Sequence, residues 1–235
     1  MSQTATLSLQ ARPAPLMFDP KAAAVLVIDM QNDFGAKGGM FDRAGIDISG
    51  IQAAVAPTAR VLAVARAAGT LVIYLQMQHR GDLSDMGPPS APHHQRHARL
   101  AVGSTMSAPD GSPTRILIAG EWGTQIVPEL TPQPGDIVVP KHRFSGFFET
   151  PLHSILQTLG ARHLIVTGCT TSICVESTIR DAMFRDYACV LLEDCTAEPI
   201  GQGNARSNHD ASLLTIEVLL GWVSSSEAFL AALAG

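Results

Sequence analysis

An unbroken run of apolar residues, Ala22-Ala23-Ala24-Val25-Leu26-Val27-Ile28, leads directly into the acid Asp29. A run without polar alternation is typical of a strand that is buried on both faces of a parallel sheet. A helical pattern over residues 51–68 follows, closed by Gly69, and residues 70–75 form another apolar run. Strand, helix and strand in this order predict a right-handed parallel βαβ unit.

The same alternation of strand and helix continues to the end of the chain. Further strands are predicted at residues 136–139, 163–167, 188–192 and 221–223, and helices at residues 151–159, 172–187 and 210–219. Ser224 and Glu227 have the spacing of a capping box for one more helix. We therefore predict an α/β fold, a three-layer sandwich with a central, mostly parallel sheet. One domain is expected over residues 21–235, after an N-terminal arm at residues 1–20.

The composition is that of an ordinary globular protein rather than of a disordered chain. Hydrophobic residues make up 46% of the 235 residues and charged residues 16%, with a net charge of −5. An acidic chain without a run of lysine or arginine argues against a nucleic-acid partner. No apolar run is long enough for a bilayer, and residues 1–15 lack the pattern of a signal peptide. We therefore expect a cytoplasmic protein with no membrane partner.

Residues 79–114 form the least regular stretch of the chain, rich in proline, glycine and histidine. A long irregular insertion in an α/β domain is usually a functional loop or lid, and a surface excursion or oligomer contact is the equally weighted alternative. His93, His94 and His97 lie in this stretch and could form a metal site, but ordinary polar roles are favoured for them. The four cysteines lack zinc spacing, so no structural zinc is expected.

Three of the predicted strands are followed by residues that can carry chemistry. Asp29 follows the first strand, Lys141 follows the strand at residues 136–139, and Cys174 opens the helix after the strand at residues 163–167. The carboxyl ends of parallel strands share one edge of the sheet, where reactive groups gather. A helix N-terminus and a nearby lysine both stabilise a thiolate, and free backbone N–H groups there can hold an oxyanion. This coincidence predicts a cysteine nucleophile.

Each of these residues also has an ordinary structural interpretation. Asp29 could cap a turn, Lys141 could be a solvated surface residue, and Cys174 could be a core cysteine. A cysteine-protease pairing of Cys174 with His142 is a further alternative. Cys169 is better placed to line a pocket than to attack. Core positions are expected for the remaining two thiols, Cys189 and Cys195.

Three segments together resemble the motifs of the isochorismatase-like cysteine hydrolases. They are VIDMQNDF at residues 27–34, VPKHRFSGFF at residues 139–148 and VTGCTTSICVEST at residues 166–178. The segments occur in the family's order, and the resemblance runs from about residue 22 to the C-terminus. It implies the Rossmann-like fold of that family. Ureidoacrylate amidohydrolases are the most similar branch, and biuret hydrolases and N-carbamoylsarcosine amidohydrolases come next.

The resemblance implies a mechanism and a set of site residues. Asp29 would take the thiol proton, Lys141 would stabilise the thiolate, and Cys174 would attack an amide or ureido carbonyl to form a thioester. Backbone N–H groups of Thr170 and Cys174 would form the oxyanion hole, next to a cis Cys169–Thr170 peptide bond. The residues expected to bind substrate are Phe34, Gln78, His79, Phe144, Ser145 and Phe147.

The predicted function is that of a cysteine-dependent amidohydrolase, which cleaves a C–N bond of a small ureido, carbamoyl or amide substrate resembling ureidoacrylate. Biuret, a larger lactam, and a non-catalytic oligomeric module are the alternatives. Arg143 could bind a substrate carboxylate or form a surface ion pair. Nicotinamidases of the wider superfamily carry an Asp/His metal motif after the second strand, and residues 76–82 lack it. No metal or cofactor is expected, and the family implies a homodimer or homotetramer.

Overall fold

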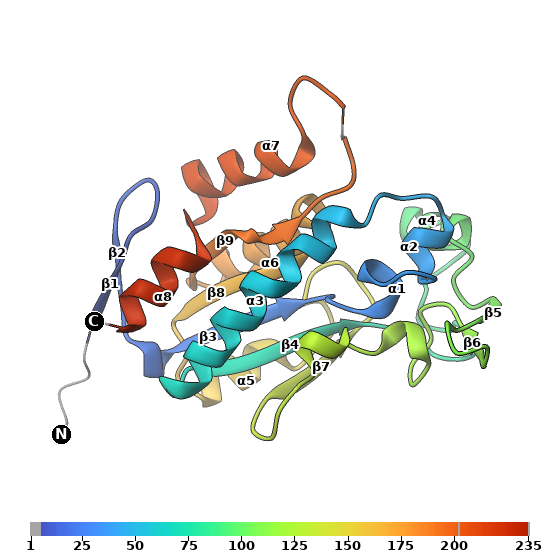
Figure 1. Cartoon of the computed structure of the whole chain (residues 1–235), viewed down its shortest axis with the longest axis horizontal. Helices are drawn as coiled ribbons and strands as arrows, with labels where there is room; N and C mark the ends of the chain where they lie inside the picture. Colours follow the sequence, from blue (N-terminus) through green and yellow to red (C-terminus); the bar gives the residue numbers. More distant parts are fainter. Residues whose placement is uncertain (1–5, 202, 235) are drawn as a thin grey trace.

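The fold is built on one parallel sheet, seen in a computed structural model that describes residues 6–201 and 203–234 (Figure 1). Its six strands lie in the order β10-β9-β8-β3-β4-β7, and each neighbouring pair is parallel. The strands are β3 (Ala23–Ile28), β4 (Leu71–Met77), β7 (Ile137–Lys141), β8 (His163–Cys169), β9 (Ala188–Ala197) and β10 (Trp222–Ser224). The apolar run therefore lies inside the sheet, between β4 and β8.

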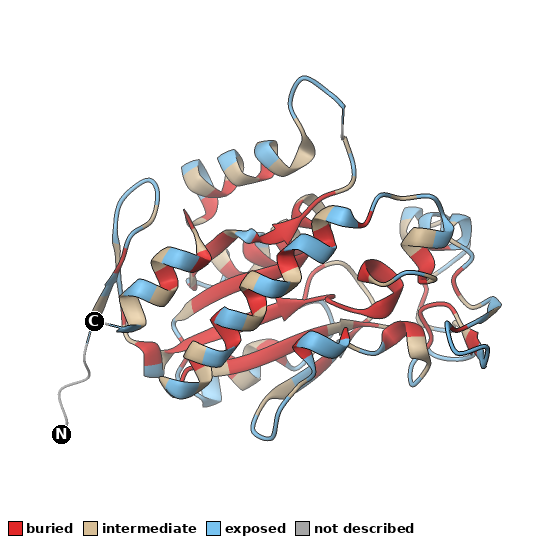
Figure 2. Cartoon of the chain, in the orientation of Figure 1, coloured by how far each residue is buried: buried red, intermediate tan, exposed pale blue. Residues whose placement is uncertain are grey.

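The run that forms β3 is buried along its whole length because the sheet is covered on both faces (Figure 2). Successive side chains of a strand point to opposite faces. Accordingly, Val25 and Val27 pack in one core cluster, and Leu26 and Ile28 pack in the other. Burying each such side chain stabilises the fold by roughly 1.5–3 kcal/mol, so an apolar residue at every position favours this central place in the sheet.

Helices form the two outer layers. The core on one face includes α3 (Ser49–Ala67) and α8 (Ser226–Ala234). The core on the other face includes α5 (Leu152–Thr158), α6 (Glu176–Met183) and a π-helical turn at Ile216–Leu220. The predicted three-layer α/β sandwich with a central parallel sheet is therefore confirmed. Within the described residues, no helix combines the length and apolar character needed to cross a bilayer.

The N-terminal segment forms a hairpin against the last helix. Strand β1 (Leu7–Leu9) pairs antiparallel with β2 (Leu16–Phe18), and the Phe18 ring stacks on Phe229 of α8 at 6.1 Å. Residues 1–5 of the predicted arm lie outside the described residues. The division of the chain into an arm and one domain remains a prediction.

The stretch at residues 79–114, expected to be irregular, contains the helix α4 (Pro92–Arg99) and a small hairpin, β5 (Thr105–Ser107) with β6 (Pro113–Arg115). A polar helix of eight residues gives only a weak local signal, because so short a helix depends on tertiary packing. The other short elements are α1 (Asn32–Gly35), α2 (Met40–Arg43), α7 (Asn208–Thr215) and the 3₁₀ turns at Pro20–Ala22, Trp122–Thr124 and Pro128–Leu130.

Two details of the predicted elements were wrong. The helix expected at residues 172–187 is preceded by a π-helical turn at Thr171–Val175, and α6 ends at Met183. The last helix is capped by Ser225 rather than by Ser224. The Ser225 hydroxyl accepts the Ala228 N–H at 3.2 Å. Ser224 cannot take this role because it belongs to β10, where its hydroxyl donates to the Gln10 carbonyl at 2.6 Å.

Candidate active site

The carboxyl edge of the sheet brings together the three residues predicted to carry chemistry. Asp29 directly follows β3, Lys141 is the last residue of β7, and Cys174 lies in the π-helical turn after β8. Because the strands are parallel, their carboxyl ends share this edge. All three side chains are buried, and Asp29 and Cys174 line the same cavity.

Asp29 and Lys141 form a buried ion pair. The Lys141 Nζ donates to Asp29 Oδ2 at 2.7 Å, and the two residues are 1% and 2% exposed. The Asp29 Oδ1 accepts the Met77 N–H at 3.1 Å, and the Lys141 Nζ also donates to the Arg143 carbonyl at 3.1 Å. Buried charges are tolerated where they are paired and hydrogen-bonded in this way. Lys141 is therefore not a solvated surface residue.

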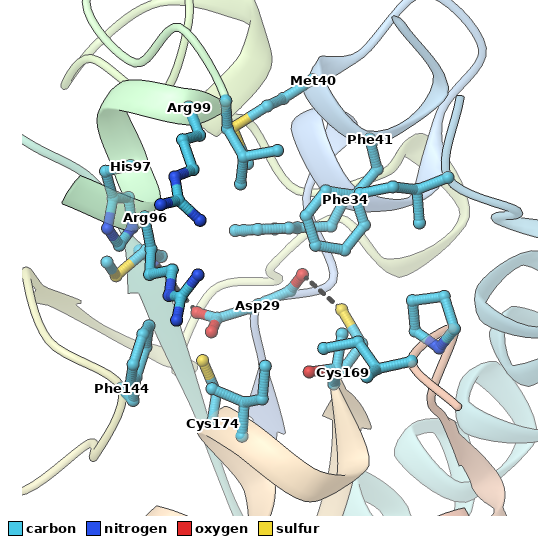
Figure 3. A pocket seen from close by; sticks show the side chains of 17 residues that line it. Asp29, Phe34, Met40, Phe41, Arg96, His97, Arg99, Phe144, Cys169 and Cys174 are labelled. Carbon is cyan, nitrogen blue, oxygen red and sulfur yellow. Dashed lines mark hydrogen bonds between the residues drawn. The ribbon is translucent and has the colours of Figure 1, made fainter. Parts of the chain in front are cut away.

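The Cys174 thiol faces this ion pair. Its interactions with Asp29 and Lys141 are among those that set the pKa values of all three groups. Figure 3 shows the sulfur directed toward the Asp29 carboxylate. Burial raises the pKa of the thiol, and the positive charge of Lys141 opposes that rise. A thiol whose pKa is raised in this way is neutral in the resting site.

The same environment prepares the two charged residues for proton transfer. Burial raises the pKa of the Asp29 carboxyl, although Lys141 acts against this. For Lys141, burial lowers the pKa, but interactions with its partners, of which the charge of Asp29 is the largest, outweigh burial and the net pKa is raised. A carboxylate with a raised pKa accepts a thiol proton more readily, and an ammonium group that stays charged offsets the thiolate.

Glu198 anchors the turn that presents the thiol, a contact that the sequence analysis missed. Its carboxylate accepts the Ser172 N–H at 2.8 Å and the Ser172 hydroxyl at 2.5 Å, from 26 positions further along the chain. The Thr171 hydroxyl shares a hydrogen bond with the Thr196 hydroxyl at 2.9 Å. These contacts hold the π-helical turn in place and so fix the direction of Cys174.

The turn begins with an unusual backbone segment. The Cys169–Thr170 peptide bond is cis, as the resemblance implies. Gly168 before it has a φ of +117°, and a Cβ there would lie 2.0 Å from the Ile28 carbonyl oxygen, so a side chain cannot be accommodated. Thr170 and Cys174, whose N–H groups were predicted to hold the oxyanion, both line the cavity.

A cavity of about 520 Å³ adjoins the thiol, a size that suits a small molecule. Two cations, Arg96 and Arg99 of α4, line it, and Figure 3 shows both guanidinium groups reaching into it. Neither arginine was predicted as a site residue from the sequence. The apolar part of the lining comes from Phe34, Met40, Phe41, Ile46, Met77, Leu100, Phe144, Ile173, Pro199 and Ile200.

The six residues expected to bind substrate fall into two groups. Those that line the cavity are Phe34 and Phe144. Gln78 and His79 lie outside the lining. The Gln78 N–H donates to the Lys141 carbonyl, and the His79 backbone pairs with Leu117 and Ala119. The His79 ring contacts the Asp85 carboxylate at 3.0 Å. A role for Gln78 or His79 in contacting substrate therefore has no support from the shape of this cavity.

Ser145 and Phe147 also lie outside the lining. The Ser145 hydroxyl donates to the Asp181 carboxylate at 2.5 Å and accepts the Phe147 N–H at 3.1 Å. The Phe147 ring stacks on Tyr187 with 6.0 Å between centroids, inside a core cluster. These contacts indicate a packing role, in which both residues hold the segment after Lys141 against α6.

Arg143 and His142 have partners away from the cavity. The Arg143 Nη1 donates to the Asp85 carbonyl at 2.6 Å and to the His142 carbonyl at 2.7 Å. Arg143 does not line the cavity and forms no ion pair among the described residues, so neither role considered for it, a carboxylate site or a surface ion pair, has support. His142 contacts the exposed Glu149 at 3.1 Å and does not line the cavity, so a pairing with Cys174 is not supported.

The other three cysteines are buried thiols without the same partners. Cys169 lines the cavity, and its thiol donates to the Asp29 carbonyl at 3.2 Å. Cys189 and Cys195 lie in the two core clusters, where burial raises the pKa of each to about 12. Burial raises the pKa of Cys169 as well. Cys174 is the thiol whose pKa is set by both Lys141 and Asp29.

Comparison with known proteins identifies the class to which this sandwich belongs. Residues 23–228 match the isochorismatase domain, which is nearly the whole chain. The chain therefore belongs to the isochorismatase family.

Solved structures of similar proteins agree with this assignment. A cysteine hydrolase from Pseudomonas syringae pv. phaseolicola 1448A has 29% sequence identity and a TM-score of 0.76, over 92% of this chain and 94% of that one. An isochorismatase family protein from Desulfovibrio vulgaris has 27% identity and a TM-score of 0.72, over 91% and 99%. N-carbamoylsarcosine amidase from Thermoplasma acidophilum shares the fold, with 24% identity, a TM-score of 0.63 and coverage of 87% and 96%.

Proposed function

We propose that this protein is a cysteine-dependent amidohydrolase, which cleaves a C–N bond of a small ureido, carbamoyl or amide substrate that carries a carboxylate. The observation that carries the proposal is the meeting of Cys174, Lys141 and Asp29 beside one cavity. Membership of the isochorismatase family and similarity to a protein named cysteine hydrolase support a thiol-dependent hydrolysis. Ureidoacrylate is a substrate of the proposed kind.

In the first half of the proposed reaction, Asp29 takes the thiol proton of Cys174. Lys141 keeps its own proton and offsets the thiolate, which attacks the substrate carbonyl carbon. The carbonyl oxygen becomes an oxyanion, held by the backbone N–H groups of Thr170 and Cys174. The C–N bond then breaks, and Asp29 gives its proton to the leaving nitrogen. Ammonia or an amine departs and leaves a thioester on Cys174.

In the second half, the same residues hydrolyse the thioester. Asp29 takes a proton from a water molecule, and the resulting hydroxide attacks the thioester carbonyl. The backbone N–H groups of Thr170 and Cys174 again hold the oxyanion. When the C–S bond breaks, the acid product leaves and Asp29 returns the proton to the Cys174 sulfur. The net reaction adds one water across the C–N bond and restores the site.

Arg96 and Arg99 support a substrate that carries a carboxylate. They lie three positions apart on α4 and both line the cavity. A guanidinium group binds a carboxylate through two parallel hydrogen bonds. Neither arginine takes part in an ion pair among the described residues. Ureidoacrylate offers a carboxylate and biuret does not, so these cations favour a ureido acid over biuret.

Replacing Arg96 or Arg99 with glutamine should raise KM for the carboxylate substrate by roughly 5- to 30-fold, since a partly exposed charge-assisted hydrogen bond contributes about 1–2 kcal/mol. The kcat should change little, because the cations act on binding rather than on the reacting carbonyl. Steady-state kinetics with the acid and with its uncharged ester would measure this. The exposed Arg80, which is outside the lining, gives the matched control Arg80→Gln. An equal loss on both substrates would rule out carboxylate binding.

A screen for released ammonia tests the proposed function as a whole. The panel comprises ureidoacrylate, biuret, N-carbamoyl amino acids and simple amides. We expect the highest kcat/KM for a substrate that combines a ureido or carbamoyl group with a carboxylate. If no member of the panel is hydrolysed, the proposal is contradicted. Turnover that persists in Cys174→Ala would contradict the mechanism.

The pH dependence of kcat/KM should have an acid limb above 3.8, the ordinary aspartate pKa. Protonation of Asp29 removes the base, and burial raises the pKa of Asp29, so activity is present above that raised value and is lost as the pH falls through it. The raised pKa of Lys141 predicts no loss of its proton below about 10.5. An uncharged substrate keeps its own titration out of the profile. An acid limb at or below 3.8 would contradict this assignment.

Two alternatives have less support. A cavity of about 520 Å³ favours a small substrate over a large lactam. A non-catalytic module would not need a thiol beside a buried ion pair, so the arrangement favours an enzyme. Assembly as a homodimer or homotetramer, and a cytoplasmic location, remain part of the proposal by analogy with the family.

A further inference from the structure

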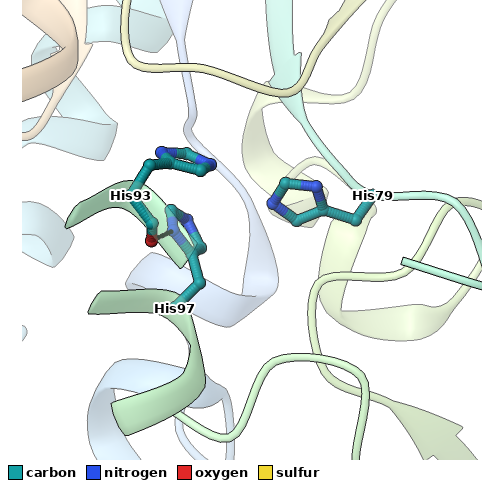
Figure 4. Close-up of side chains that lie close together, drawn as sticks. All are labelled: His79, His93 and His97. Atoms are coloured by element: carbon teal, nitrogen blue, oxygen red, sulfur yellow. Dashed lines mark hydrogen bonds between the residues drawn. The ribbon is translucent and has the colours of Figure 1, made fainter. Parts of the chain in front are cut away.

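Three histidines converge beside the cavity, outside the proposed catalytic residues. His79 lies just beyond the end of β4, and His93 and His97 lie one turn apart on α4. One ring nitrogen from each falls within 4.8 Å of the other two (Figure 4). The His93 and His97 rings are 4.0 Å apart between centroids, and the His79 and His97 rings 5.2 Å. The end of β4 and the helix α4 therefore bring three imidazole rings close together.

The hydrogen bonds leave ring nitrogens of this cluster without partners. The His79 Nδ1 contacts the Asp85 carboxylate at 3.0 Å, and the His97 Nδ1 contacts the His93 carbonyl at 2.9 Å. Among the described residues, the buried His79 Nε2 and both buried nitrogens of His93 have no hydrogen-bond partner. Buried polar atoms are rarely left unsatisfied, because each costs about 1–3 kcal/mol. The unsatisfied nitrogens of His79 and His93 are close together, so one bound ion would satisfy a nitrogen of each.

The arrangement of the bonded nitrogens is that of metal-binding histidines. A ligating histidine usually donates its other ring N–H to a carboxylate or a backbone carbonyl, which fixes the tautomer and turns the free nitrogen toward the ion. Asp85 has this relation to His79, and the His93 carbonyl has it to His97.

We propose that His79, His93 and His97 bind one divalent transition-metal ion of the zinc class. An all-imidazole set suits zinc, cobalt, nickel or copper rather than magnesium or calcium. Tetrahedral zinc with bonds of about 2.0–2.1 Å places its ligand nitrogens roughly 3.3 Å apart, so the cluster would close by up to about 1.5 Å. Three protein ligands leave one position for water.

The position of the ion assigns it a role in holding the cavity wall. It would join α4 to the end of β4, and α4 carries Arg96 and Arg99. The reaction proposed at Cys174 has no step that involves this ion, and the proposed site departs from the expectation from the sequence that no metal is bound. Ordinary polar roles were predicted for the loop histidines because nothing in the sequence places them beside His79. An effect of the ion on carboxylate binding rests on the proposed function, but metal binding itself does not.

Metal content and cobalt titration of the purified full chain test this proposal. After removal of metal with a chelator, Zn²⁺ or Co²⁺ should bind at about one equivalent, and Co²⁺ should give visible absorption bands of a low-coordinate site. His93→Gln and His97→Gln should weaken binding by about 100-fold or more, and Asp85→Asn by roughly 10- to 100-fold. His94→Gln is the matched control, because His94 contacts the Gly87 carbonyl and lies outside the cluster. It should bind like the parent protein.

The same titration in Cys174→Ala separates the histidine site from binding at the catalytic thiol. Unchanged stoichiometry there supports the proposal, and loss of binding would overturn it. Binding that is absent in the parent protein, or unchanged in His93→Gln and His97→Gln, would also overturn it. Circular dichroism would confirm that each variant is folded. Because the readout is metal content, a failure here leaves the proposed hydrolysis standing, and an inactive protein that binds the ion would refute only the proposed hydrolysis.

Discussion

Replacing Cys174 with alanine should lower kcat by about 10⁴-fold or more, because the thioester cannot form without the sulfur. Serine in its place should be nearly as inactive, since a hydroxyl gives up its proton far less readily than a thiol. The measurement is ammonia release at saturating substrate. The alanine variant should still bind substrate, because the cavity wall and its two arginines are unchanged.

Cys189→Ala is the matched control for this change. Cys189 is likewise a buried cysteine, but it lies in a core cluster outside the cavity lining. Its replacement should lower the stability modestly and leave kcat within about twofold of the parent protein. A Cys174→Ala protein that keeps more than about a tenth of the parent turnover would exclude Cys174 as the nucleophile.

Replacing Lys141 with methionine should lower the free energy of unfolding by about 3–5 kcal/mol, because the buried Asp29 carboxylate loses its counter-charge. Asp29→Asn should have a similar effect, since it leaves a buried ammonium group unpaired. Both variants should also lose activity. Asp29→Asn removes the proton acceptor, and Lys141→Met removes the group that stabilises the thiolate. Denaturant unfolding followed by circular dichroism would give the two free energies.

The double variant Asp29→Asn with Lys141→Met separates stability from catalysis. With both charges removed, much of the lost stability should return, because a buried ion pair contributes little net stability over neutral residues of similar size. Activity should not return. The exposed pair Lys37–Asp42 is the control, and breaking it with Lys37→Met should cost less than about 1 kcal/mol. A Lys141→Met loss as small as that would mean that the ion pair is not buried in solution.

The sheet and its reactive edge could be predicted because their signals are local. An apolar run such as residues 23–28 can be satisfied only between two covering layers, and a residue that directly follows a parallel strand must lie at the carboxyl edge. Asp29 and Lys141 were found in this way. Cys174 needed only the added observation that it opens a helical segment after its strand.

The cavity wall could not be predicted, because it depends on contacts between distant segments. Nothing near Arg96 in the sequence indicates that α4 folds over the site, and Glu198 reaches Ser172 from 26 positions away. Conversely, Ser145 and Phe147 were assigned to the pocket from their nearness to Lys141 in the sequence. Side chains that are neighbours along a segment point in different directions, and these two point into the core.

Alkylation of the folded protein with limiting iodoacetamide, followed by peptide mass mapping, tests whether Cys174 is the nucleophile. We expect that Cys174 is modified first among the four cysteines, that activity falls in proportion, and that substrate protects it. The rate should drop sharply in Lys141→Met, which lacks the charge that stabilises the thiolate. Modification of Cys174 without loss of activity, or loss of activity while Cys174 stays unmodified, would contradict the account.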